Sequence, residues 1–276
     1  MPLNTDKPGL MDAHAHICDA AFDADREAVL ARARSAGVDA VVAVGEDLAD
    51  ARKNLALAEE YPMLRPAAGL YPSHLDLEAA AAMAAFIREN HPRLTAIGEV
   101  GLDYWIAKEA RDREIQQEIF RIFISLSNAL ELPLNVHSRS AGRHAVALLL
   151  EEGALRVQMH AFDGKAGAAL PAVEAGYFFS VPPSVVRSRQ KQKLVKRLPL
   201  SCLLVESDSP VLGPIPGERN EPANIRVALE AIAAIKGVDP AAAAATVSEN
   251  ARRLYGGPHE HGRLQRLRPE PNMHFP

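Results

Sequence analysis

The chain has 276 residues, of which 48% are hydrophobic and 24% charged, a composition typical of folded globular proteins. Its 31 Lys and Arg against 35 Asp and Glu give a formal net charge of −4. This balance excludes a strongly basic protein that binds nucleic acid through its overall charge. No apolar run reaches the about 18 residues of a membrane helix, and the start of the chain does not resemble a signal peptide. We therefore expect a soluble, cytoplasmic protein.

Short apolar runs alternate with longer amphipathic segments along most of the chain. In chain order, the predicted strands are 10–16, 39–45, 64–71, 95–103, 133–139, 156–162, 177–182 and 202–208. The predicted helices that follow them are 25–36, 47–60, 77–90, 109–130, 142–151, 165–175, 189–198 and 223–235, with one more at 240–255. Nearly continuous apolar strands between helices indicate a parallel sheet that is covered on both faces.

Eight strand–helix units in roughly 250 residues match the α/β class of folds, and within it a single (β/α)8 TIM barrel. We predict this barrel, with an extra C-terminal helix, over residues 1–255. An open doubly wound sheet is the alternative. Residues 256–276 are rich in Pro and polar residues, and we predict a C-terminal tail there.

The first predicted strand ends in Asp12-Ala-His14-Ala-His16. Because side chains alternate along a strand, His14 and His16 share a face at its carboxyl end, and Asp12 lies one layer deeper. Active sites of TIM barrels lie at this end. Two adjacent imidazoles can bind one divalent metal, although two hydrogen-bonded core histidines give the same pattern. A second pair, His259 and His261, falls in the polar tail, where we predict a solvated pair.

Other predicted strands also end in side chains that bind metals. Glu99 interrupts the apolar fourth strand, and burying it without a partner would cost several kcal/mol. His137 and His160 end the fifth and sixth strands, 160 − 137 = 23 residues apart, which is about one strand–helix unit. Asp208 ends the eighth. Together with the first strand, these residues offer enough ligands for two divalent cations.

The ordered set of motifs resembles the TatD family of metal-dependent hydrolases, relatives of the amidohydrolase superfamily. The matching segments span residues 10 to about 255. They are Asp12-x-His14-x-His16, Gly98-Glu99-Val-Gly-Leu-Asp103, His137-Ser-Arg139, His160-x-Phe162-x-Gly164, Glu206-Ser-Asp208-Ser-Pro210 and Arg219-Asn220-Glu221-Pro222.

The resemblance implies a nuclease that hydrolyses phosphodiesters, typically a DNase that degrades single strands from the 3′ end. It also implies one or two divalent ions, and we expect two, whose identity (Zn, Mn, Mg or Fe) the ligand types leave open. The implied ligands are His14, His16 and Asp208 for the first ion and His137 and His160 for the second, with Glu99 bridging both.

Two carboxylates are candidates for roles beside metal binding. Asp208 is our candidate to orient and deprotonate the attacking water, with a role as metal ligand alone as the alternative. Glu206 lies on the same face but deeper, where it would orient a ligand, and Asp12 has a similar place on the first strand.

Substrate contacts are expected from three further residues. Tyr71 stands where the family commonly has His after the third strand, and its hydroxyl can donate to a phosphate oxygen. Arg139, beside His137, and Arg219, in the loop after the eighth strand, can bind phosphate bidentately. Surface ion pairs are the alternative for both arginines.

Two further features lie outside these motifs. The basic run over residues 187–197 either lines an approach path for a polyanion or forms an exposed helix face. Cys18 and Cys202 fall at opposite ends of the predicted barrel, so we expect two free thiols.

The leading hypothesis is thus a metal-dependent phosphodiesterase whose substrate is nucleic acid, with no membrane and no protein partner indicated. A metal-dependent hydrolase of a small ester, lactone or amide is the alternative. A barrel that has lost catalysis and serves as a scaffold is a third hypothesis, against which the intact ligand set argues.

Overall fold

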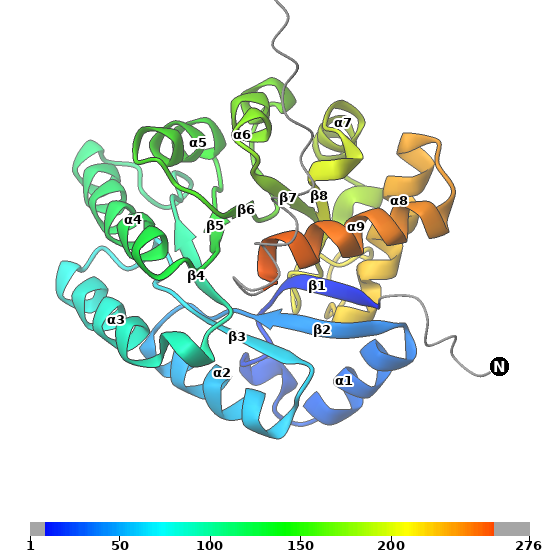
Figure 1. Cartoon of the computed structure of the whole chain (residues 1–276), viewed down its shortest axis with the longest axis horizontal. Coiled ribbons are helices and arrows are strands. Elements are labelled where there is room, and N and C mark those ends of the chain that lie inside the picture. The colour runs from blue at the N-terminus through cyan, green and yellow to red at the C-terminus, as the bar shows by residue number, and fades with distance from the viewer. Residues whose placement is uncertain (1–8, 257–276) are drawn as a thin grey trace, which may run out of the picture.

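A computed structural model describes residues 9–256, and its parallel strands form a barrel with a ring of helices outside it (Figure 1). The strands neighbour one another in chain order: β1 (Leu10–Ala15), β2 (Val38–Ala43), β3 (Leu64–Ala68), β4 (Ala96–Gly101), β5 (Leu134–His137), β6 (Val157–Met159), β7 (Phe178–Val181) and β8 (Leu203–Val205). The His16 N–H donates to the Ser209 carbonyl (2.8 Å) and the Asp208 N–H to the His14 carbonyl (2.9 Å). These bonds join β1 to the segment after β8, and the predicted (β/α)8 barrel is confirmed.

The helices lie where the amphipathic segments predict them: α1 (Arg26–Ser35), α2 (Leu48–Glu60), α3 (Leu77–Asn90), α4 (Ala110–Leu130), α5 (Gly142–Glu151), α6 (Leu170–Glu174), α7 (Arg189–Arg197), α8 (Ile225–Lys236) and α9 (Pro240–Tyr255). Side-chain caps mark several of the starts, because Asp47, Asp76 and Asp239 each accept hydrogen bonds from two amides of the first turn. Gly237 ends α8 in the left-handed conformation (φ 65°).

Several predicted strands are shorter than expected; the one predicted over 156–162 ends at Met159, so His160 lies just after it. Two other elements differ in character. The helix predicted over 165–175 is a 3-10 turn (Ala166–Ala169) followed by the short α6, in which Pro171 occupies the first turn, where an N–H is not needed. The strand predicted over 202–208 ends at Val205, because the chain turns away from the sheet and Asp208 takes a positive φ of 52°. The polar residues after β8 therefore lie in a loop and not in a strand.

One end of the barrel is covered by α9, which crosses it in Figure 1. Ala251 and Leu254 of this helix pack against Ala13, Phe178 and Leu204 in the barrel interior. The Tyr255 hydroxyl also reaches inside and bonds to Asn135 and Gln158. The predicted extra C-terminal helix thus closes the amino-terminal end of the strands, which leaves the carboxyl end for a site.

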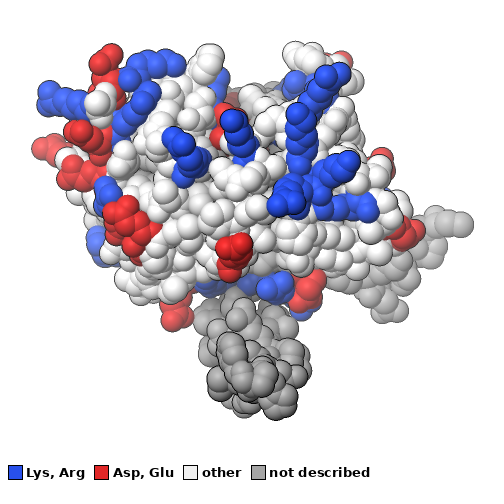
Figure 2. Space-filling view, turned by 90° about the horizontal axis from the view of Figure 1, so that it is seen from above, with Lys and Arg blue, Asp and Glu red and all other residues white. Residues whose placement is uncertain are grey.

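Charge and hydropathy of the surface add two observations. No helix between residues 9 and 256 is long and apolar enough to span a membrane. Figure 2 shows Lys and Arg side chains on both sides of the face in view, mixed with Asp and Glu on the left and with few acidic neighbours on the right. The predicted tail and its pair, His259 and His261, lie outside the described residues.

Candidate metal centre

A cavity of about 450 Å³ opens at the carboxyl ends of the strands. Histidine and carboxylate side chains from β4, β5 and the segments after β1, β6 and β8 line it. Arg139, Lys191 and Tyr71 contribute polar groups to its wall, and Val211 and Leu212 contribute apolar ones. The cavity therefore combines side chains that can bind a metal with positively charged Lys and Arg side chains. It lies where the active sites of barrel enzymes are found.

The first group of side chains lies at the end of β1. The Nε2 atoms of His14 and His16 are 3.2 Å apart. Glu99 Oε2 lies 3.6 Å from the first of these nitrogens and 3.2 Å from the second. Asp208 Oδ1 lies 3.5 and 3.8 Å from the same two atoms. Four donor atoms from β1, β4 and the loop after β8 thus converge on one small volume.

The second group shares Glu99 with the first. Glu99 Oε1 lies 2.6 Å from His137 Nδ1 and 3.7 Å from His160 Nε2. The His160 ring stacks on the His14 ring with centroids 3.6 Å apart, and its Nε2 is 4.0 Å from Asp208 Oδ2. The structure therefore brings together all the residues that the sequence suggests as metal ligands, with Glu99 between the two groups.

Each of three histidines is oriented by a hydrogen bond on the side away from the shared volume. His14 Nδ1 donates to Asn135 Oδ1 (2.8 Å), and the amide of Asn135 is itself fixed because its nitrogen donates to the Ala13 carbonyl. His160 Nδ1 donates to Glu206 Oε2 (2.8 Å), and His137 Nε2 to Asp103 Oδ2 (3.1 Å). For His14 and His160 these acceptors fix the tautomer, so the second nitrogen of each of these two rings presents its lone pair to the centre.

The protonation of the buried groups suits metal binding. Burial lowers the pKa of His14 to about 3 and that of His160 to about 4, so both rings are neutral at pH 7. Burial would raise the pKa of Glu99, but the charge of the neighbouring His137 and hydrogen bonds from His137 and His16 hold it well below its ordinary value. Neutral imidazoles around an ionised carboxylate are the forms that bind a cation.

His16 and His137 behave differently because they face Glu99 most closely. Burial alone would lower the pKa of both rings, but Glu99 raises each to about 9, with help from Asp208 at His16 and from Asp103 at His137. The protons on these two rings compensate the negative charge of the buried carboxylate. A bound metal cation would compensate that charge instead, and the rings would then lose their protons.

The donor set fits a divalent metal. Two triads have one ligand atom from each member within 4.8 Å of the others: His14, Glu99 and His160, and His14, His16 and Asp208. Imidazole and carboxylate ligands suit Zn, Mn or Fe, and carboxylate with water suits Mg. The second triad is the ligand set that the resemblance implies for the first ion. His137 belongs to neither triad, although its Nδ1 is beside Glu99.

The backbone around these ligands has unusual geometry. Gly101, at the end of β4, has a φ of +141°, and a Cβ at this position would lie 2.2 Å from the His137 carbonyl oxygen. Only glycine allows β4 and β5 to approach so closely between Glu99 and His137. Ala161 and Asp208 also have positive φ values, 38° and 52°. Strained residues of this kind concentrate at functional sites.

Among the carboxylates expected to support ligands, Glu206 contacts a ligand ring and Asp12 does not. Glu206 is fully buried and also accepts from the Ala161 N–H (2.9 Å). Asp12 Oδ1 accepts from the His14 N–H (3.2 Å) and the Ser207 N–H (2.8 Å), which ties β1 to the segment after β8. Its burial raises its pKa to about 8. Asp12 therefore fixes the backbone that carries His14 and Asp208.

The three expected substrate contacts have different surroundings. Arg139 is exposed at the wall of the cavity. Tyr71 lines the cavity too, but its hydroxyl donates to Asp103 Oδ2 (3.2 Å). Arg219 is not among the residues of the cavity wall, because its guanidinium forms a bidentate pair with Asp25 (2.8 and 2.6 Å). The surface ion pair, our alternative for this arginine, is what the structure contains.

Sequence reasoning missed Asn135, Asp103 and Lys191 as site residues. Asn135 precedes His137 by two residues, so the alternation of strand side chains could have found it. Asp103 closes the glycine-rich motif around Glu99. Lys191 belongs to the basic run: on α7 it is half-buried, lines the cavity and donates to the Ala161 carbonyl (3.1 Å). Burial lowers the pKa of its ammonium against the attraction of Glu206 and Asp208.

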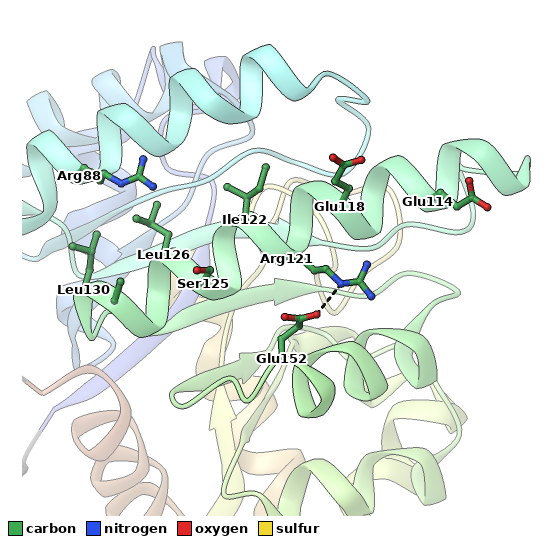
Figure 3. Close-up of a pocket in the computed structure, with 10 residues that line it drawn as sticks. Arg88, Glu114, Glu118, Arg121, Ile122, Ser125, Leu126, Leu130 and Glu152 are labelled. Atoms are coloured by element: carbon green, nitrogen blue, oxygen red, sulfur yellow. Dashed lines mark hydrogen bonds and ion pairs between the residues drawn. The ribbon is translucent and has the colours of Figure 1, made fainter.

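A second hollow, of about 820 Å³, lies on the outer surface along α3 and α4 (Figure 3). Its charged side chains include Arg121, which is paired with Glu152 (Nε to Oε1, 2.8 Å). No histidine or cysteine lines this hollow.

Cys18 and Cys202 are both buried, and both are free thiols, as predicted.

A (β/α)8 barrel with histidines and carboxylates gathered at the carboxyl ends of its strands defines a metal-dependent hydrolase. Comparisons with known proteins agree. Residues 11–256 match the family described as TatD related DNase. The human deoxyribonuclease TATDN3 is 44% identical over 90% of this chain and 94% of its own. The 3′-5′ ssDNA/RNA exonuclease TatD of Salmonella typhimurium is 30% identical over 89% and 98%. The chain belongs to the TatD family.

The structural comparison gives the same answer. The crystal structure of YJJV, a TatD homologue of Escherichia coli K12, superposes with a TM-score of 0.82 at 26% sequence identity. It covers 90% of this chain and 98% of the other. A metal-dependent hydrolase of Bacillus subtilis, YabD, is 35% identical over 89% of this chain and 98% of its own. These relatives support the use of divalent metal by this chain.

Proposed function

We propose that this chain is a divalent-metal-dependent phosphodiesterase that removes nucleotides from the 3′ ends of single-stranded nucleic acid. The observation that carries the proposal is the cavity at the carboxyl ends of the strands. It places Arg139 and Lys191 beside the converging histidines, Glu99 and Asp208. A pocket with metal ligands at its base and two cations in its wall suits a phosphodiester.

Two ions are proposed at the centre. His14, His16 and Asp208 would hold one, His137 and His160 would hold the second, and Glu99 would contact both. Divalent cations bound in this way supply an activated water near neutral pH and neutralise charge on the phosphate. The close approach of both Glu99 oxygens to histidines of the two groups supports the bridging role.

The side chains of this protein would then perform separate tasks. Arg139 and Lys191 bind the non-bridging phosphate oxygens and hold the scissile phosphorus above the centre. Asp208, whose two oxygens face different histidines, accepts the proton of the attacking water at a carboxylate oxygen. Asn135, Asp103 and Glu206 keep the histidine rings in place.

The experiment uses single-stranded DNA and RNA oligonucleotides labelled at the 5′ end, purified protein, and Mg²⁺, Mn²⁺ or Zn²⁺, with a chelator as the control. Products that shorten stepwise from the 3′ end only when metal is present are the expected result. Elemental analysis of the same preparation gives the number of ions per chain. The Asp208→Asn variant should lose the shortening activity by several orders of magnitude.

The same preparation distinguishes the alternative function. Carboxyl esters and lactones are assayed beside the oligonucleotides under identical metal conditions. Turnover of these substrates without any cleavage of nucleic acid would contradict the proposal and favour a hydrolase of small esters. A protein that binds no divalent ion and hydrolyses neither class would favour a scaffold.

A further inference from the structure

The single tryptophan of the chain, Trp105, lies against Arg139, a residue that lines the cavity. Trp105 belongs to the loop between β4 and α4, at the carboxyl end of the strand that carries Glu99. Its side chain is 57% exposed, more than that of its neighbour Ile106 (44%). A large exposed aromatic ring is common on surfaces, so its position and its neighbours must decide whether it has a role.

The loop that carries this ring is fixed to the metal centre. Asp103 Oδ1 accepts from the N–H groups of Trp105 (2.8 Å) and Ile106 (3.0 Å). The other oxygen of Asp103 accepts from His137 Nε2 (3.1 Å). The Tyr104 N–H donates to the Arg139 carbonyl (3.0 Å). One carboxylate thus holds both a proposed ligand and the backbone of Trp105, so the loop that carries the indole is fixed relative to the proposed metal centre.

Two cations flank the ring. The Arg139 guanidinium carbon lies 4.9 Å from the ring centroid, and Lys108 Nζ lies 4.8 Å from it. Both side chains are exposed, so a flat ligand can take the place of either on the indole. Arg139 also lines the cavity, which makes it the link between Trp105 and the centre. A flat aromatic surface bordered by cations next to a phosphate site matches a nucleotide, with base and phosphate bound side by side.

We propose that Trp105 is a stacking platform for an unpaired nucleobase of the nucleotides that flank the scissile phosphate. This inference rests on the proposed function. When the base covers the indole, Arg139 and Lys108 pair with the phosphates of the strand. Bases inside a duplex stack on both faces, and a terminal base is held by its pairing partner, so this contact favours single-stranded ends over paired ones. Because every base offers an aromatic face, the platform accepts any sequence.

The kinetic test uses oligonucleotides that lack one base. One substrate carries all of its bases, and two others lack the base of the 3′-terminal or of the penultimate nucleotide. Trp105→Ala should lower kcat/KM about tenfold for the complete substrate and should have little effect on one of the two base-lacking substrates. Trp105→Phe should restore most of the loss. Ile106→Ala, which truncates an exposed side chain of the same loop, should behave like the wild type.

A binding test needs no turnover. The wild-type protein loaded with metal is titrated with a phosphorothioate-linked single strand that resists hydrolysis. Because Trp105 is the single tryptophan, its fluorescence reports on this ring alone. Its emission should fall with the same Kd that anisotropy of a labelled strand gives, and a blunt duplex should change it far less.

The results separate the two hypotheses. If the wild type cleaves and binds single strands while tryptophan emission is constant, the platform is wrong and the proposed function stands. An equal loss of kcat/KM for all three substrates in Trp105→Ala would also overturn the platform. A wild-type protein that neither cleaves nor binds nucleic acid would contradict the proposed function, and the platform with it.

Discussion

The imidazole of His160 donates from Nδ1 to Glu206 Oε2 over 2.8 Å, and both side chains are buried in the barrel. The bond connects the segment after β6 to the segment after β8. It leaves His160 Nε2 directed toward Glu99 and Asp208. Carboxylates that hold a metal-binding histidine in this way fix its tautomer and raise its basicity.

Glu206→Gln should therefore weaken metal affinity and lower kcat by about 10–100-fold, with a smaller effect on KM. The amide keeps the size of the side chain and removes its charge. Metal titration of the apoprotein and steady-state kinetics measure the two effects. Ser180→Ala, which removes a different donor to Glu206, is the matched control. Unchanged metal affinity in Glu206→Gln would contradict the positioning role.

Metal removal should lower the thermal stability of the protein. A cation that binds only the folded chain stabilises it by about 2.7 kcal/mol at a hundredfold excess over Kd. For a chain of this size each kcal/mol shifts Tm by about 2–4 °C. Melting curves recorded with Mn²⁺ and with a chelator should differ by several degrees. The His14→Ala variant should show little of this shift, and an equal shift in that variant would place the metal elsewhere.

Lys191→Met should raise KM and lower kcat/KM for oligonucleotides about tenfold or more, because a hydrogen bond from a cation to phosphate is lost. Methionine preserves the packing of the half-buried stem. Lys193→Met, two residues along the same helix and exposed, is the control and should have a small effect. Equal effects of both substitutions would show that Lys191 acts only through the overall positive charge of the surface and not through a specific contact with phosphate.

Arg219→Ala should leave kcat/KM within about twofold of the wild-type value, whereas Arg139→Ala should lower it about tenfold or more. Arg219 is held by Asp25 and by the Ala21 carbonyl, so it does not face the cavity. Its ion pair is exposed, and a small change in Tm is expected. A large loss of activity in Arg219→Ala would show that this arginine leaves Asp25 for the substrate.

The two buried thiols should make stability depend on pH in alkaline solution. Burial raises the pKa of Cys18 and of Cys202 from the ordinary value of 9.0 to about 12. The stability that each thiol contributes is fully present below its pKa in the unfolded chain. It is lost as pH rises toward its pKa in the folded chain. Between about pH 8 and pH 10, the ionisation of each thiol in the unfolded chain should lower the free energy of unfolding by about 1.4 kcal/mol.

Urea unfolding at both pH values measures this loss in the wild type and in Cys18→Ala/Cys202→Ala. The double variant corrects for lysines and tyrosines that titrate in the same range. Parallel losses in the two proteins would show that the thiols ionise freely in the folded state.

The linear sequence was sufficient to predict the barrel and the convergence of the proposed metal ligands. The apolar run before His14 and the amphipathic segment at 240–255 are local patterns. Each can be recognised from the spacing of apolar residues within a short stretch of sequence. His14, His16, Glu99, His137, His160 and Asp208 fall at strand ends, and the barrel geometry forces strand ends to meet at one rim. The order of the motifs was therefore enough to predict their convergence.

Tertiary structure decided which Lys and Arg side chains face the proposed metal centre and how the histidine rings are oriented. Lys191 and Lys193 belong to one basic run, and only the rotation of α7 against the barrel directs the first of them into the cavity. Arg219 is occupied by Asp25, 194 residues away in the sequence. The tautomer of His14 depends on Asn135, 121 residues away. Such contacts arise from packing between distant elements, and local sequence patterns carry no record of them.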